Sequence, residues 1–254
     1  MNKRWMALAG LAVVGLAAVW FLFLRSDNPA PVSLEDAVEA ATESTGDGSP
    51  TATVPEAVDE SLPESEGDTG SGDIPGAGLD GTWSLLSGAE SFAGYRVGEE
   101  LVGIGVTEAV GRTGGVTGTL ELEGSTLTAV SIEVDMTSLR SDDDRRDGAM
   151  SRQALQTGAF PTAGFVLTEP LDLGSIPAEG VAVSVTAVGD LTLHGVTKSI
   201  AMPLEAQLVG ERIVVIGSAD IVYGDFDIQL PSAPILVGVE DHGLIELQMT
   251  FARG

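Results

Sequence analysis

The chain has 254 residues, 38 of them acidic and 12 basic, which gives a formal net charge of −26. Such a charge excludes binding to a nucleic-acid backbone, and no basic stripe interrupts it. The absence of cysteine excludes disulfides, thiolate zinc sites, iron–sulfur clusters and acylation at a lipobox.

Residues 1–25 are predicted to form an uncleaved membrane anchor. The run from Trp5 to Leu24 carries no charge, and about 20 residues of helix span roughly 30 Å, one bilayer core. A cleaved signal peptide is the alternative, but no small-x-small site ends the run. Lys3 and Arg4 precede it, so the positive-inside rule places the N-terminus in the cytoplasm. We expect a single-pass protein of the cell membrane whose main domain is extracytoplasmic, on the periplasmic or cell-wall side.

Residues 26–78 are predicted to be a disordered acidic linker. They include 13 Asp or Glu and no Lys or Arg, and they are rich in Pro, Ser, Thr and Gly. Such a segment buries too little apolar area to offset its ordering entropy. Residues 33–44 form a weak amphipathic patch that is compatible with a transient helix, but the sequence offers it no partner. The expectation is a solvated spacer without a binding role.

Residues 79–254 are long enough for one domain, and apolar residues alternate along most of it. The alternation falls on even positions in 120–136 and 200–208, and on odd positions in 181–193, 213–223 and 245–251. Each run is typical of a strand with one apolar face, as antiparallel sheets require. Counting the runs predicts about eight strands.

One helix is expected to interrupt the strands, over residues 141–158. Ser141 is the predicted N-cap, Gly158 ends the helix, and Met150, Ala154 and Leu155 form its buried stripe. Asp142–Asp144 are interpreted as acids of the first turn rather than as a calcium site. Arg146 and Asp147 are interpreted as a structural pair in a lid, with contact to a lipid head group as the alternative.

The stretch LTLHGVTKSI, residues 191–200, is predicted to be a hairpin tip. Pairing Leu193 with Ile200 and Leu191 with Met202 keeps every apolar residue on one face. A four-residue loop from Gly195 to Lys198 is favoured, because a two-residue Val-Thr turn is poor. His194 then lies at a strand end on the polar face, as a structural corner rather than a catalytic base.

No catalytic motif is evident, and we predict that the protein is not an enzyme. The chain has no Gly-x-Ser-x-Gly elbow, and His194 and His242 are the only imidazoles. With only two imidazoles in the chain, the sequence gives little support for a catalytic triad or a histidine metal site. We expect no cofactor and no metal.

The hairpin stretch, extended to residues 189–200, resembles a signature of the YceI-like family, also described as polyisoprenoid-binding or lipid-binding periplasmic proteins. Three other segments resemble the same family in the right order: DMTSLRSDDDRRDGAM (135–150), GAFPTAGFVLTEPLDL (158–173) and VGVEDHGLIELQMTF (237–251). The likeness covers residues 81–251. Tyr223 and Asp227 depart from it, standing where the family often has arginine and glycine.

The resemblance implies an all-β fold, an eight-stranded antiparallel lipocalin-like β-barrel with a short lid helix. It also implies an apolar tunnel that holds a polyprenyl or similar chain. The function expected from it is non-catalytic, extracytoplasmic binding of an isoprenoid or similar amphiphilic lipid. The alternative is an envelope structural or stress-related interaction module without a ligand and with a filled lumen. The other expected partner is the bilayer, through the N-terminal helix; a homodimer is left open.

The candidate ligand contacts are inward-facing apolar positions, each of which is alternatively packed core. Small residues recur on the same face, including Ala163, Ala187, Gly189, Ala206, Gly217 and Ala219, and they favour an open lumen. The candidates are Tyr95, Val97, Ile132, Val134, Phe165, Leu167, Val185, Leu191, Ile221 and Phe251.

Overall fold

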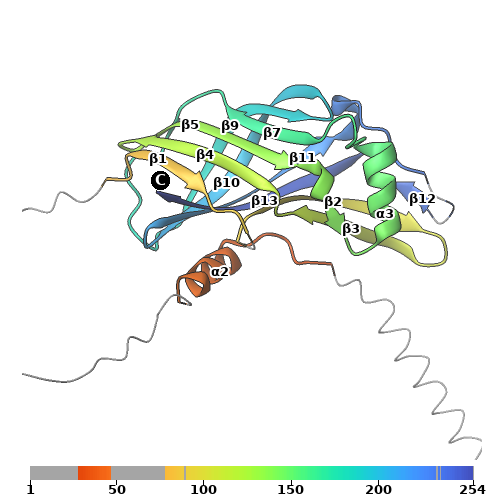
Figure 1. The fold of residues 1–254 in the computed structure, drawn as a ribbon, viewed down its shortest axis with the longest axis horizontal. Helices are drawn as coiled ribbons and strands as arrows, with labels where there is room; N and C mark the ends of the chain where they lie inside the picture. The colour runs from red at the N-terminus through yellow and green to blue at the C-terminus, as the bar shows by residue number, and fades with distance from the viewer. Residues whose placement is uncertain (1–27, 47–77, 89, 233, 235, 254) are drawn as a thin grey trace, which may run out of the picture. The chain divides into compact units, whose positions relative to one another are not determined.

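Antiparallel strands close into an eight-stranded barrel in the computed structural model (Figure 1). The structure describes residues 28–46, 78–88, 90–232, 234 and 236–253, and residues 31–254 form one compact unit. Each barrel strand pairs with the next, and the last pairs with the first. In order of pairing, the strands are β1 (Gly81–Leu85), β4 (Val116–Glu123), β5 (Thr126–Asp135), β7 (Thr162–Leu167), β9 (Val183–Leu193), β10 (Val196–Val209), β11 (Arg212–Val222) and β13 (His242–Arg253).

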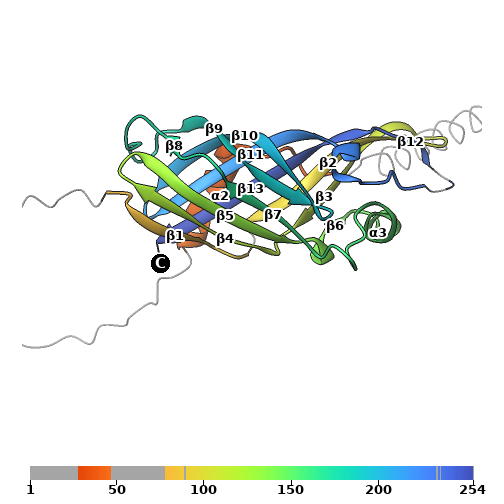
Figure 2. The ribbon, with the colours of Figure 1, turned by 90° about the horizontal axis from the view of Figure 1, so that it is seen from above.

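Additional strands lengthen the barrel. β2 (Phe92–Leu101) also pairs with β13, and β3 (Gly105–Thr113) pairs with β2. The short strands β6 (Arg140–Ser141), β8 (Leu171–Asp172) and β12 (Leu236–Val239) pair with β3, β5 and β2. Both views place β12 and helix α3 (Asp144–Ala149) at the end of the barrel opposite β1 (Figures 1 and 2). We call these two ends the α3 end and the Trp83 end, after Trp83 in β1.

The predicted alternation is confirmed in the strands where it is strongest. In β9, Ala187, Leu191 and Leu193 are buried whereas Thr186 is exposed. The same pattern holds in β4, where Val116, Leu120 and Leu122 are buried. Successive side chains of a strand point to opposite faces. The buried apolar side chains therefore point into the barrel, and the side chains between them face outward.

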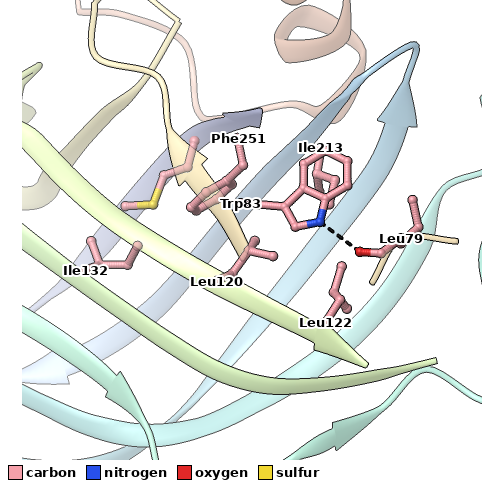
Figure 3. Packing of buried hydrophobic residues seen from close by; sticks show 8 residues of the cluster. Leu79, Trp83, Leu120, Leu122, Ile132, Ile213 and Phe251 are labelled. Atoms are coloured by element: carbon pink, nitrogen blue, oxygen red, sulfur yellow. Dashed lines mark hydrogen bonds between the residues drawn. The ribbon is translucent and has the colours of Figure 1, made fainter. Parts of the chain in front are cut away.

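A cluster of buried side chains fills the Trp83 end. The indole of Trp83 is 2% exposed, and its Nε1 donates a hydrogen bond to the carbonyl of Leu79 at 2.9 Å. Figure 3 shows this ring among side chains from β4, β11 and β13: Leu120, Leu122, Ile213 and Phe251. The hydrogen bond satisfies the indole N–H, so a large ring closes this end without a buried unpaired donor.

The β9–β10 hairpin is tighter than predicted, and the predicted register is wrong. Leu193 pairs with Val196 rather than Ile200, and Met202 pairs with Ala187. The turn consists of His194 and Gly195, whose φ angles are 52° and 76°. Two left-handed residues suit the twist of a two-residue hairpin, so this turn is preferred to the four-residue loop. The register moves by an even number of residues, so the predicted faces survive.

The lid helix is shorter than predicted, and its cap is a different residue. α3 starts after Asp143, whose carboxylate accepts the backbone N–H groups of Arg145 at 2.6 Å and Arg146 at 3.1 Å. The helix continues as a π-helical turn, η2 (Met150–Ala154), and Gln156 then adopts a φ of 46°. Ser141 lies in β6 and hydrogen-bonds to Asp147 instead. The 3-10 turns η1 (Met136–Ser138) and η3 (Tyr223–Phe226) follow β5 and β11.

Helix α2 (Leu34–Gly46) packs against the outer face of the barrel, which corrects the linker prediction for this stretch. Ala37 and Ala41 are buried against Val214 and Ile216 of β11. The Arg212 guanidinium donates to the carbonyl of Ala41 at 3.0 Å and pairs with Glu90 at 3.0 Å. The sequence indicates that the outer face of β11 is covered, because residues 213–216 are four consecutive apolar residues. Both faces of this strand are therefore apolar and need to be buried.

None of the described helices is long and apolar enough to cross a membrane. The predicted anchor, residues 1–25, lies outside the described residues, and it remains a prediction. Residues 47–77 of the predicted linker also lie outside the described residues.

Candidate ligand cavity

A cavity of about 600 Å³ lies inside the barrel, between the Trp83 end and α3. Its walls are formed by inward-facing residues of the barrel strands together with β2 and β3. Most of these side chains are aliphatic, among them Leu120, Val130, Leu191, Leu193, Met202, Leu204, Val215 and Met249. A pocket of this size with apolar walls suits a small molecule or a hydrocarbon chain.

Most of the predicted contact residues line this cavity. Two of them do not, namely Leu167 and Val185, which are half-buried further along β7 and β9 toward the Trp83 end. The predicted residues that line it are Tyr95, Val97, Ile132, Val134, Phe165, Leu191, Ile221 and Phe251.

The small residues of the inward face do not create the cavity in the way the sequence suggested. Of the six singled out, only Ala163 lines it. A Cβ on Gly189 would collide with the ring of Phe165, and one on Gly217 would collide with Leu204. These glycines therefore make room for a large side chain on the neighbouring strand.

Several lining residues were missed by the sequence analysis. Met202, Leu204 and Val215 share the inward parity of their strands, so the alternation could have found them. Another group has no period, because it lies in the irregular segment after η3. This group comprises Ile228, Gln229, Leu230, Pro231 and Pro234.

Charged and hydroxyl groups gather where α3 covers the cavity. Arg146 of α3 pairs with Glu99 of β2 at 2.7 Å and also contacts Asp142. Burial opposes the charge of Arg146, but hydrogen bonding and attraction to Glu99, with a contribution from Asp142, leave its pKa raised. The Arg146–Glu99 pair thus fastens α3 to the barrel wall. Asp147 bonds to Ser141, so the predicted pairing of Arg146 with Asp147 is not seen.

Two tyrosines supply neutral hydroxyl groups at this end of the cavity. Tyr95 and Tyr223 both line it. Burial raises the pKa of Tyr95 well above its usual value, and burial together with Glu240 raises the pKa of Tyr223 to about 12. Both hydroxyls therefore stay protonated at neutral pH, so each can donate a hydrogen bond.

The two histidines lie away from the cavity lining. His194 is buried rather than on the polar face, with its ring 4.4 Å from that of Phe160 and its Nδ1 3.0 Å from the carbonyl oxygen of Phe226. His242 is exposed beside Asp241, whose hydrogen bond is the main cause of a raised His242 pKa. Among the described residues, no group of three or more acidic or histidine side chains is arranged to hold a metal ion.

The model of the YceI-like domain matches residues 86–251, almost the whole barrel. The chain belongs to the YceI-like family. The match begins within the loop after β1 and ends in β13, so both α3 and the cavity walls belong to the YceI-like domain.

Individual relatives agree with this assignment. A UPF0312 protein of Vibrio parahaemolyticus is 34% identical over 122 residues, which cover 44% of this chain and 60% of the relative. A UPF0312 protein of Vibrio campbellii gives the same values. The match thus spans about three fifths of the length of these curated relatives.

A solved structure shares this fold. It is a domain of Saccharophagus degradans described as polyisoprenoid-binding and implicated in plant cell wall breakdown. It is 20% identical with a TM-score of 0.55, and the alignment covers 68% of this chain and 98% of that domain.

Proposed function

We propose that this protein binds a long-chain isoprenoid or a similar amphiphilic lipid in its barrel cavity, on the extracytoplasmic side of a membrane, without catalysis. The observation that carries the proposal is the apolar cavity of about 600 Å³ inside the barrel. The structural neighbour described as polyisoprenoid-binding supports the same class of ligand. A module with a filled lumen is disfavoured by the cavity.

The distribution of polar groups suggests the orientation of the lipid. The walls toward the Trp83 end are hydrocarbon, whereas Tyr95, Glu99 and Arg146 lie at the α3 end. Burying each methylene contributes about 0.8 kcal/mol, and a buried head group without partners would cost free energy. The chain therefore points toward Trp83, and the head group lies beneath α3.

Two observations support the remaining parts of the proposal. Neither histidine lines the cavity, so the described walls offer no imidazole base to a bound ligand. The extracytoplasmic side is supported by the positions of Lys3 and Arg4 before the uncharged run 5–24.

Mass spectrometry of organic extracts from the purified full chain tests the proposal. Ala163→Phe places a ring in the cavity, and Thr162→Phe places the same ring on the exposed face of β7 as a matched control. We expect lipid in the wild-type protein and in the control, and a loss of at least about tenfold in Ala163→Phe. Thermal melting verifies that both variants fold.

Two results would contradict the proposal. One is a wild-type protein that neither carries a lipid nor takes one up from detergent solution. The other is an equal amount of lipid in the two folded variants.

A further inference from the structure

The α3 end carries a group of exposed aliphatic side chains, which we call the rim patch. Three of its members lie in or beside the β2–β3 turn, and two lie in the segment that contains β12. The pairing of Leu236 with Leu101 joins these two segments. The rim patch consists of Val102 (58% exposed), Ile104 (53%), Val106 (84%), Leu230 (45%) and Val237 (58%).

The rim patch is continuous with the cavity wall. Leu230 is both exposed and part of the lining, and the lining residues Leu101 and Leu236 are sequence neighbours of Val102 and Val237. The cavity lining therefore reaches the exposed aliphatic side chains at Leu230. Contiguous exposed apolar surface of this kind marks a site of contact with a membrane or a protein.

We propose that the rim patch inserts into the surface of a lipid bilayer, so that the cavity opens toward the membrane. This inference rests on the proposed function, because it supplies the route by which a lipid with low water solubility reaches the cavity. Aliphatic side chains gain free energy when they enter the interfacial region of a bilayer.

The length of the chain supports a membrane rather than a protein as the occupant. Because α2 packs on the barrel, the segment that connects the barrel to the uncharged run 5–24 is much shorter than the predicted linker of residues 26–78. Only six residues, 25–30, separate that run from the compact unit that begins at Pro31. Fully extended, the path from Leu24 to Pro31 measures about 25 Å. With residues 5–24 in a bilayer, the barrel is held close to that bilayer's surface.

Charge identifies the kind of bilayer contact. The net charge is −26, and the exposed Glu100 and Glu240 flank the rim patch. Attraction to anionic lipids cannot drive docking of such a surface. The contact is therefore apolar, and zwitterionic vesicles are the appropriate probe.

The absence of cysteine allows a clean test in the full chain. Ile104→Cys places a single environment-sensitive fluorophore in the rim patch. Ile176→Cys places it at another exposed aliphatic position, 49% exposed and outside both the rim patch and the cavity lining, as a matched control. Each protein is reconstituted into phosphatidylcholine vesicles that contain lipids with a quencher on the acyl chain.

We expect the probe at position 104 to shift to the blue and to be quenched at least about threefold more than the probe at position 176. Equal quenching at the two positions, or no quenching at position 104, would overturn the inference. A blue shift without quenching would also overturn it, because a second copy of the chain would then cover the rim patch.

Lipid uptake separates this inference from the proposed function. Val102→Ser combined with Ile104→Ser and Val106→Ser should slow loading from vesicles about tenfold and leave loading from detergent unchanged. The control, Ile176→Ser with Val181→Ser, should slow neither. Equal loading from vesicles by the wild type, the triple variant and the control would contradict bilayer docking but not the proposed cavity function. Failure of the wild type to load from detergent would contradict the proposed cavity function.

Discussion

His194 shows how a single residue can satisfy a backbone requirement and a packing requirement together. Its φ of 52° fits the two-residue turn, and its buried ring contacts Phe160 and the carbonyl of Phe226. The sequence indicated a hairpin at this position and a structural histidine. It could not reveal the burial, because Phe160 and Phe226 are distant in sequence and neither belongs to the hairpin.

Substitution of His194 should distinguish the two requirements. His194→Val places a β-branched side chain at a positive φ and should lower the free energy of unfolding by about 2–4 kcal/mol. His194→Asn tolerates the left-handed region and should lose only about 1–2 kcal/mol, from the missing ring contacts. Urea denaturation measures both, and equal losses would contradict a role for the turn conformation.

Arg146 and Arg145 provide a second residue-scale comparison, because they are neighbours on α3. Arg146 pairs with the buried Glu99, whereas Arg145 is exposed and makes no ion pair with the described residues. Arg146→Met leaves the Glu99 carboxylate without its cation and should cost about 1–3 kcal/mol. Arg145→Met should cost less than about 0.5 kcal/mol. A similar loss in both variants, measured by thermal or urea unfolding, would show that the Glu99 pair does not fasten the lid.

The alternation of apolar residues predicted the main barrel strands and eight of the residues that line the cavity, because parity is a local property of a strand. The predicted hairpin register was wrong, since parity does not change when a register moves by two or four residues. Leu167 and Val185 have the same parity as the predicted contacts that line the cavity, and only tertiary packing, which a periodic pattern does not encode, places them outside it.

At the scale of an element, α3 depends on one capping carboxylate. Hydrogen bonds from the backbone N–H groups of Arg146 and Arg145 lower the pKa of Asp143. Because the folded-state pKa is the lower one, the contribution of the cap is complete above the unfolded-state pKa of about 3.9. It is lost as the pH falls through the folded-state value.

Hydrogen exchange of the α3 amides tests this dependence. After correction for the intrinsic exchange rates, protection of 144–149 should be constant between pH 7 and about pH 5 and should fall below about pH 4. Asp143→Asn still accepts hydrogen bonds but does not titrate, so its profile should be flatter. A wild-type profile that matches that of Asp143→Asn would contradict the capping role.

Helix α2 offers a prediction about the outer face. Ala41 is fully buried against the barrel, whereas its neighbour Thr42 is exposed. Ala41→Glu introduces a charge into this contact and should detach α2, raising amide exchange in 34–46 at least tenfold without unfolding the barrel. Thr42→Glu is the matched control. Unchanged protection in Ala41→Glu would mean that α2 does not depend on this contact.

The sequence predicted neither the partner of α2 nor the outer face that it covers. The acidic, proline-rich composition of residues 26–78 favoured a linker. Residues 34–46 contain no proline, so this composition is typical of the surrounding segment rather than of the helix itself. The apolar run at 213–216 was the available signal, but a run on both faces says only that a cover exists. It does not say which segment provides the cover.

At the scale of the whole molecule, the cavity runs through the barrel and meets the rim patch at Leu230. The Trp83 cluster closes one end, and α3 with the segment around β12 borders the other. The fold class could be predicted from strand periodicity and from the family resemblance. The irregular segment that completes the cavity wall could not, because it has no repeating pattern.

The central claim is that this cavity binds a hydrocarbon chain, and a chain-length series measures it most directly. The full-length protein is titrated with straight-chain alcohols of increasing length in an isothermal calorimeter. Each added methylene contributes about 0.8 kcal/mol, so Kd should fall about fourfold per carbon until the chain reaches the Trp83 cluster, and then level off. Ala163→Phe should lower the chain length at which Kd levels off, whereas Thr162→Phe should leave it unchanged. A Kd that does not depend on chain length, or no binding by any alcohol, would contradict the claim.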